Sequence, residues 1–154
     1  MERTPIAIDL GDFPQIFHGI LKDTPIYDSS CSSDARVYFL DWDGGLFLKS
    51  AAPGSLKLEG EMDAYYHSLG LGPEVLAYHS AEQDWLLTRR LSGEDCISQK
   101  YLDDPIRLCD TLAELLRRLH DENHDGCPVR DLTAQRLKIA EENYRSGRYD
   151  KSMF

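Results

Sequence analysis

Long apolar segments are absent from this sequence. No apolar run approaches the roughly 20 residues that a helix needs to cross a bilayer. The first residues, MERTPIAIDLGDF, also lack the basic stretch followed by a hydrophobic one that is typical of an export signal. We therefore expect a cytoplasmic protein without a membrane partner.

Basic residues are outnumbered by acidic ones. The 17 lysines and arginines face 27 aspartates and glutamates, so the net charge is −10 at pH 7. Nucleic acids and anionic membranes bind proteins through a basic face, and we expect neither as a partner. The acidic balance suits a cationic ligand, although the same charge can simply keep a protein soluble.

Cysteine is scarce. The four cysteines are Cys31, Cys96, Cys109 and Cys127. They are widely spaced in a chain without an export signal, which predicts reduced thiols rather than disulfides. His120, His124 and Cys127 have side chains that could bind a metal, but their spacing matches no common zinc pattern and no fourth ligand lies nearby. We expect no metal site there.

The first half of the chain has the pattern of strands around one helix. Residues 36–50 read RVYFLDW, a turn at residues 43–45, and LFLKS, which predicts a β-hairpin. The next segment, SLKLEGEMDAYYHSL, has apolar residues at helical spacing. EVLAYHSAEQDWLLTRRL then supplies two more strands around a polar turn at residues 81–84. The expected order is strand, strand, helix, strand, strand.

After Gly93 the pattern becomes helical. The strongest helix is predicted over residues 105–120, with Pro105 in its first turn. Its apolar stripe consists of Ile106, Cys109, Leu112, Ala113, Leu116 and Leu119. A second helical segment is expected within residues 131–147, with Asp131 or Thr133 as a possible N-cap and Gly147 beyond its end. The sequence thus predicts an α+β protein: a kinase-like N-terminal lobe at residues 1–91, with an antiparallel sheet and one helix, followed by a connector and helices at residues 92–154.

Lys49 ends the apolar run Leu46–Leu48. Such a lysine either reaches water at a strand end or faces inward to hold an anion. In kinases a strand lysine contacts the α- and β-phosphates and is held by a glutamate from the next helix. The order of elements predicted here matches that arrangement, which favours the second explanation.

Two glutamates of the predicted helix could hold Lys49. They are Glu59 and Glu61. If Leu58, Met62 and Tyr65 mark the buried face of the helix, Glu61 lies beside that face and can turn inward. We therefore predict Glu61 as the partner, with Glu59 as the competing candidate.

A serine-rich segment precedes the hairpin. The stretch IYDSSCSSDARVY places Ser32 and Ser33 in an expected loop between two strands. Small residues let backbone N–H groups approach phosphate oxygens, and a serine hydroxyl can donate as well. The G-x-G-x-x-G motif of protein kinases is absent from the sequence.

Several segments together resemble the bacterial aminoglycoside 3′-phosphotransferases, which are ATP-dependent enzymes with a protein-kinase-like fold. The segments are SSCSSDARVYFLDWDGGLFLKS, the helix with Glu61, DWLLTRRLSGED, LLRRLHDENHDGCP and QRLKIAEENYRSG. The resemblance begins near residue 20 and continues to the end of the chain. It implies ATP or GTP as the nucleotide, Mg²⁺ as its metal, and an aminoglycoside as a partner of the full-length protein.

The resemblance also implies a set of nucleotide-binding residues. The set is Ser32, Ser33, Phe47, Lys49, Glu61, Arg89 and Leu91. Within it the two serines position the nucleotide, Phe47 stacks on the base, and Lys49 contacts the α- and β-phosphates while Glu61 orients it. The backbone carbonyl of Arg89 and the backbone N–H of Leu91 face the adenine.

The sequence departs from the family in one respect. It contains neither the His-Gly-Asp motif followed by Asn nor the later magnesium-binding Asp, so no catalytic residue or metal ligand is assigned. The resemblance therefore implies an N-terminal part of such an enzyme with little or no turnover by itself, in which residues 92–154 are the hinge and the first helices of an incomplete helical lobe. We expect residues 94–154 to be either poorly ordered or buried against a second copy of the chain, in a homo-oligomer formed through the exposed helical stripe. Two alternatives stay open: a kinase for choline, a sugar amine or a macrolide, and a non-catalytic nucleotide-binding module.

Overall fold

The computed structural model describes residues 4–93, 95–129 and 132–149. Residues 1–123 and 124–154 form two compact units. This division is one of compactness and differs from the boundary expected after residue 91. The expected boundary separates a nucleotide-binding lobe from a helical lobe, and it stays a prediction. Within the described ranges, no helix combines the length and the apolar character that a membrane crossing requires.

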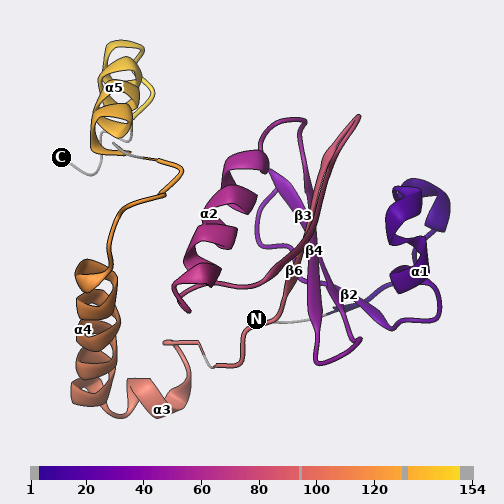
Figure 1. Ribbon diagram of the computed structural model, residues 1–154, viewed down its shortest axis with the longest axis horizontal. Helices are drawn as coiled ribbons and strands as arrows, with labels where there is room; N and C mark the ends of the chain where they lie inside the picture. Colours follow the sequence, from indigo (N-terminus) through magenta and orange to yellow (C-terminus); the bar gives the residue numbers. More distant parts are fainter. Residues whose placement is uncertain (1–3, 94, 130–131, 150–154) are drawn as a thin grey trace. The chain divides into compact units, whose positions relative to one another are not determined.

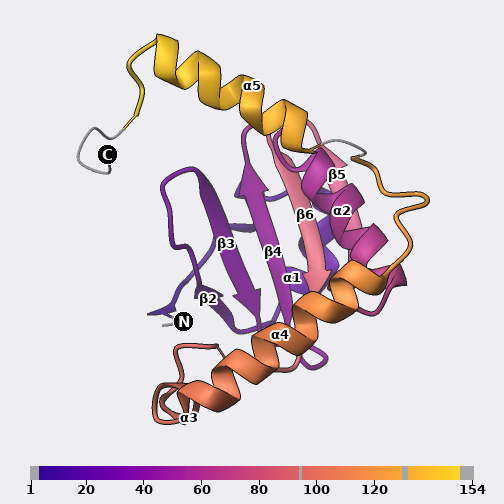
Figure 2. The same ribbon diagram turned by 90° about the vertical axis from the view of Figure 1, so that its left-hand side faces the viewer.

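The first unit is built on one antiparallel sheet (Figure 2). Its strands are β1 (Thr4–Pro5), β2 (Ile26–Asp28), β3 (Ala35–Leu40), β4 (Leu46–Ala51), β5 (Val75–Ser80) and β6 (Asp84–Arg89). Their order across the sheet is β1-β2-β3-β4-β6-β5. The predicted hairpins β3–β4 and β5–β6 are confirmed, and β4 pairs with β6 at the centre.

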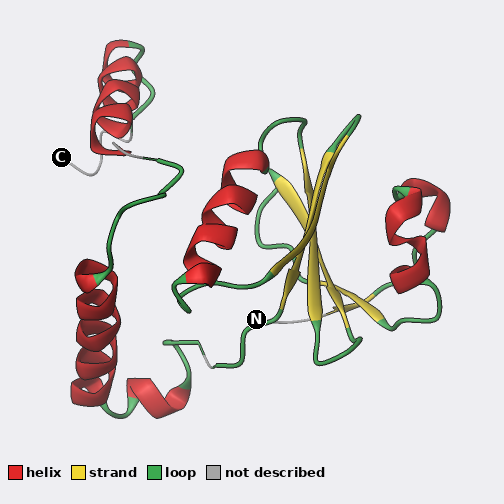
Figure 3. Cartoon of the chain, in the orientation of Figure 1, coloured by secondary structure: helices red, strands yellow, loops and turns green. Residues whose placement is uncertain are grey.

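Helices complete the α+β fold that the sequence predicts (Figure 3). The first unit contains the short helices η1 (Leu10–Asp12), η2 (Gln15–Phe17), α1 (His18–Leu21) and α3 (Gln99–Leu102), and the longer helices α2 (Lys57–Ser68) and α4 (Pro105–Asp121). The second unit contains α5 (Leu132–Arg145). The strand β1 and the helical turns near the N-terminus were not among the predicted elements, and β2 was expected only as the strand before the serine-rich loop.

The N-terminal segment covers one face of the sheet. Phe13, Phe17 and Leu21 are buried there against Leu48 of β4 and Trp85 of β6. The ring of Trp85 lies 5.2 Å from the ring of Phe13 and 6.2 Å from that of Phe17, measured between centroids. The main hydrophobic core therefore lies between the sheet and this segment, which Figure 1 shows on the opposite side of the sheet from α2.

The helix α2 approaches the other face of the sheet through a glycine. Gly60 is buried, and a Cβ atom at this position would lie only 3.1 Å from Cδ1 of Leu86 in β6. Leu56, just before the helix, is buried as well, whereas Leu58 is exposed. The side of α2 that faces the sheet is therefore defined by Leu56 and Gly60, not by the row of Leu58, Met62 and Tyr65 that the sequence analysis assumed.

The helix α4 begins where the sequence predicts. The Asp104 carboxylate accepts a hydrogen bond of 3.0 Å from the N–H of Arg107, and Pro105 occupies the first turn. The apolar stripe of α4 is exposed in this chain. Its large side chains are Ile106, Leu112, Leu116 and Leu119, and Ile106 is 75% exposed.

Candidate functional site

The candidate site begins with the alternation of β4. Successive side chains of a strand point to opposite faces of the sheet, so Leu46 and Leu48 enter the core while Phe47 and Lys49 point to the side of α2. The neighbouring strands follow the same rule, because Val37 of β3 and Leu86 of β6 are paired with Lys49. Lys49 thus belongs to the face opposite the core, which explains why it interrupts the apolar run.

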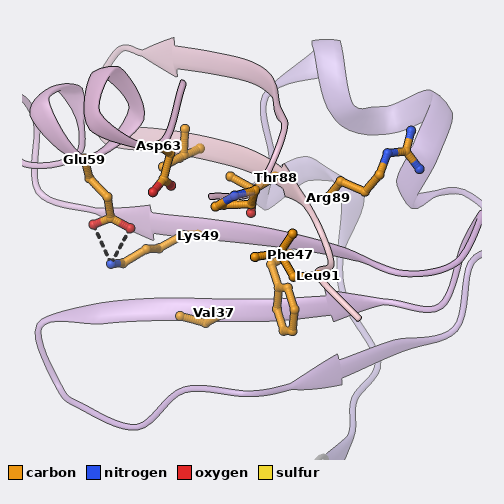
Figure 4. A pocket seen from close by; sticks show the side chains of 10 residues that line it. Val37, Phe47, Lys49, Glu59, Asp63, Thr88, Arg89 and Leu91 are labelled. Carbon is orange, nitrogen blue, oxygen red and sulfur yellow. Dashed lines mark hydrogen bonds and ion pairs between the residues drawn. The ribbon is translucent and has the colours of Figure 1, made fainter. Parts of the chain in front are cut away.

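These side chains line a cleft of about 360 Å³ (Figure 4). The lining residues are Val37, Phe47, Lys49, Glu59, Asp63, Pro73, Leu86, Thr88, Arg89 and Leu91. The volume lies within the range of small-molecule sites, roughly 300 to 1,000 Å³. The cleft is mostly apolar, with the Lys49 ammonium and two carboxylates among its polar groups, as is typical of a site that orients one charged ligand.

Lys49 is held by Glu59. Its Nζ atom donates to Oε1 of Glu59 at 2.9 Å and to Oε2 at 2.7 Å (Figure 4). The Lys49 side chain is 30% exposed and that of Glu59 is 40% exposed, so the pair is accessible to a ligand from the cleft. An ammonium fixed in this way presents a positioned positive charge to an anion.

The prediction that Glu61 orients Lys49 is wrong. Glu61 lies on the exposed side of α2, where its Oε1 atom is 3.9 Å from Nζ of Lys57. The physical reason is the close approach of Gly60 to Leu86, which turns the side of α2 with Glu59 toward β4. Two positions along a helix correspond to about 200° of rotation, so only one of the two glutamates can face Lys49.

The pairing gives a first expected result. In Glu59→Gln, Lys49 should react faster with an amine-directed acylating reagent, by up to about fivefold, because a partly exposed ion pair is worth about 0.2–1 kcal/mol. Quantitative mass spectrometry of the Lys49 peptide measures the rate. Glu61→Gln is the matched control on the same helix and should leave it unchanged. Equal rates in all three proteins would contradict the Lys49–Glu59 pair.

Asp63 is a cleft residue that the sequence analysis missed. It follows Glu59 by one helical turn and lines the same cleft. Burial raises the pKa of the Asp63 carboxyl and so does the nearby Glu59, while Lys49 acts in the opposite direction. The signal was present in the sequence, because Glu59 and Asp63 are four residues apart and share one helix face.

The connector after β6 closes one side of the cleft. The N–H of Arg89 donates to the carbonyl of Glu74 at 2.9 Å, and the N–H of Arg90 donates to that of Gly45 at 3.0 Å. No hydrogen bond of the Leu91 N–H occurs within the described residues, so this donor is available to a ligand. Its availability agrees with the role predicted for Leu91, which stays a prediction.

The Arg89 side chain is directed away from Lys49 (Figure 4). Its guanidinium donates to Oε2 of Glu74 at 3.0 Å and to Oδ2 of Asp43 at 3.2 Å. The hydrogen bonds that Arg89 donates to Glu74 and Asp43 raise its pKa further, so the group stays charged. With its charge balanced by these partners, Arg89 contributes its backbone and its aliphatic stem to the cleft.

The remaining predicted residues differ in their placement. Phe47 lines the cleft and packs on Phe39, with ring centroids 5.4 Å apart. Ser32 and Ser33 lie in the exposed loop between β2 and β3 and are not among the lining residues. The start of that loop is fixed by Ser30, whose hydroxyl accepts a 2.9 Å hydrogen bond from the N–H of Val37. The structure thus brings together Phe47, Lys49, Arg89 and Leu91, and not the two serines.

Known proteins are similar to this chain in sequence. The model of the phosphotransferase enzyme family matches residues 29–151. Over 139 residues, the chain is 42% identical to a probable aminoglycoside 3′-phosphotransferase from Lactococcus lactis subsp. lactis (strain IL1403). That match covers 90% of this chain and 53% of the relative, so the chain spans about half the length of the curated relative. These matches confirm the resemblance on which the expected fold rests, and the chain belongs to the phosphotransferase enzyme family.

Proposed function

We propose that the cleft beside Lys49 binds the nucleotide of an ATP-dependent kinase whose acceptor is a hydroxyl group of an aminoglycoside. The observation that carries the proposal is the Lys49–Glu59 pair, set into an apolar cleft on the sheet face opposite the core. The membership in the phosphotransferase family and the name of the Lactococcus relative support the reaction class and the acceptor.

The geometry of the cleft supports a purine nucleotide. At one end, the Lys49 ammonium can contact phosphate oxygens as a positioned cation. At the other, the Leu91 N–H can donate to a base nitrogen, and Phe47 and Val37 offer apolar area to the ring. Recognition by a backbone group rather than by the Arg89 guanidinium leaves ATP and GTP both acceptable.

In this proposal the residues of the cleft bind the nucleotide and orient its phosphates. Mg²⁺ accompanies the nucleotide in phosphoryl transfer and neutralises charge on its phosphates. No group of three or more potential metal ligands occurs in the part of the chain that the structure describes. The role proposed for these residues is to bind and orient the nucleotide, and a binding measurement tests that role directly.

Calorimetry with Mg-ATP tests the proposed site. Lys49→Ala should weaken nucleotide binding by about ten- to a hundredfold, because a hydrogen bond to a charged group contributes about 1.5–3 kcal/mol. Lys57→Ala is the matched control, since Lys57 is a lysine on the exposed side of α2. Equal affinities of wild type and Lys49→Ala would remove Lys49 from the site and would overturn the proposal.

A further inference from the structure

The cleft contains a second carboxylate near Lys49, that of Asp63, which is not needed to orient the lysine. Glu59 already accepts two hydrogen bonds from the ammonium. Asp63 lies one turn farther along α2 and lines the cleft together with Lys49 and Glu59 (Figure 4). Among the described residues, the Asp63 side chain takes part in no hydrogen bond or ion pair, so its carboxylate is available to act on a ligand.

The charges around the cleft leave a negative balance near Lys49. The charged residues that line it are Lys49 on β4, Glu59 and Asp63 on α2, and Arg89 on β6. The Arg89 guanidinium forms ion pairs with Glu74 and Asp43 and points away from the cleft. One ammonium therefore faces two carboxylates, and the other lining residues are uncharged.

A negative charge at Asp63 is disfavoured before any ligand enters. The carboxyl is half-buried, and burial and Glu59 both raise its pKa above the ordinary value. Phosphate groups bound at Lys49 would add further negative charge on the same side of α2. Coulomb repulsion between Asp63 and the phosphates then opposes binding, and it grows with the number of charges that the ligand carries.

We propose that Asp63 is a specificity-determining residue that limits how tightly the cleft binds phosphate groups. This inference rests on the proposed nucleotide site and assigns to its second carboxylate a role of its own. Glu59 fixes the ammonium, whereas Asp63 offsets part of its attraction for phosphate. The consequence is a site that distinguishes weakly between ATP and ADP, so that a diphosphate product can leave.

The test is a comparison of ligands with increasing charge. Affinities of wild type, Asp63→Asn and Asp63→Glu are measured by calorimetry for adenosine, AMP, ADP and ATP in a chelating buffer. Asp63→Asn should bind ATP about three- to tenfold more tightly than wild type, with smaller gains for ADP and AMP and none for adenosine. Asp63→Glu keeps the charge and should stay near wild type. Glu61→Gln removes the same charge outside the cleft and is the matched control.

The dependence on pH gives a second readout. The Asp63→Asn gain for ATP should be largest near pH 8, where Asp63 is ionised, and should shrink toward none as the wild-type carboxyl takes up its proton on acidification. Taking the ratio of the two proteins removes the titration of the ligand itself. A merely structural role of Asp63 would change the melting temperature without this dependence on ligand charge.

The outcomes separate this inference from the proposed function. If Lys49→Ala weakens ATP binding but Asp63→Asn changes the affinities for ATP and adenosine equally, the nucleotide site stands and the role of Asp63 is overturned. If Lys49→Ala has no effect, the nucleotide site itself fails. A loss of ATP affinity in Asp63→Asn, with the variant folded by circular dichroism, would also overturn the inference.

Discussion

Replacing Asp84 by alanine is expected to lower the free energy of unfolding by about 3–5 kcal/mol. Asp84 is fully buried at the start of β6. Its Oδ1 atom accepts a 2.6 Å hydrogen bond from the Ser80 hydroxyl, and its Oδ2 atom accepts one of 3.0 Å from the backbone N–H of Leu56, just before α2. Alanine would leave the buried N–H of Leu56 without an acceptor, which is more costly than the loss of the bond alone.

Urea unfolding followed by circular dichroism measures this change. Asp41→Ala is the control, because Asp41 is an exposed aspartate whose replacement should alter the unfolding free energy by less than about 0.5 kcal/mol. Ser80→Ala removes one of the donors and should cost about 1 kcal/mol. A cost for Asp84→Ala similar to that of Asp41→Ala would show that the carboxylate does not tie β6 to the start of α2.

The same carboxylate should make stability depend on acid. Burial by itself raises the pKa of Asp84, but hydrogen bonds from Ser80, the backbone of Gly54 and Leu56, and Tyr78 outweigh it and lower the pKa from 3.8 to about 2. A lowered pKa in the folded state stabilises the protein above pH 3.8, and this contribution is lost as the pH falls through about 2. In Asp84→Asn, this part of the acid dependence should disappear.

Trp85→Ala should destabilise the first unit by about 3–5 kcal/mol, a cost typical of removing a large aromatic side chain from a core. Trp85 is only 6% exposed and packs against Phe13 and Phe17. The cavity would open between the sheet and the N-terminal segment, among the buried side chains that pack on Trp85. The midpoint of urea unfolding provides the measurement.

The other tryptophan supplies the control. Trp42 is 46% exposed, next to the turn between β3 and β4, and Trp42→Ala should change the unfolding free energy by less than about 0.5 kcal/mol. The wild-type fluorescence spectrum should combine one buried and one exposed indole, and Trp42→Ala should shift it to shorter wavelength. Equal destabilisation by the two substitutions would contradict the placement of Trp85 in the core.

The central part of the fold was predictable because its signals are local. Glycines and an aspartate mark the turn between β3 and β4, where Asp43, Gly44 and Gly45 all have positive φ. Alternating apolar residues mark the strands, and Pro105 marks the start of α4. By contrast, the strand β1 has two residues and β2 has three, too few for a period to be recognised.

The face of α2 could not be predicted from apolar spacing. The residue that contacts the sheet is a glycine, which has no apolar side chain and therefore gives no signal in the apolar spacing. Leu58 fits that spacing but is exposed. The choice of Glu61 over Glu59 followed from that error. A close approach between two elements depends on both partners, here Gly60 and Leu86, and no single segment contains this information.

Because the side chains of β4 alternate between the two faces of the sheet, neighbouring residues are constrained by different surroundings. Leu46, Leu48 and Ser50 are constrained by the packing of the interior, whereas Phe47 and Lys49 are constrained by whatever occupies the cleft. A one-residue slip of β4 against its neighbouring strands would exchange the two sets, placing an ammonium in the core and a leucine on the side of α2. An extra residue can therefore be absorbed in the turn between β3 and β4, whereas an extra residue within β4 would reverse the faces of all the strand residues that follow it.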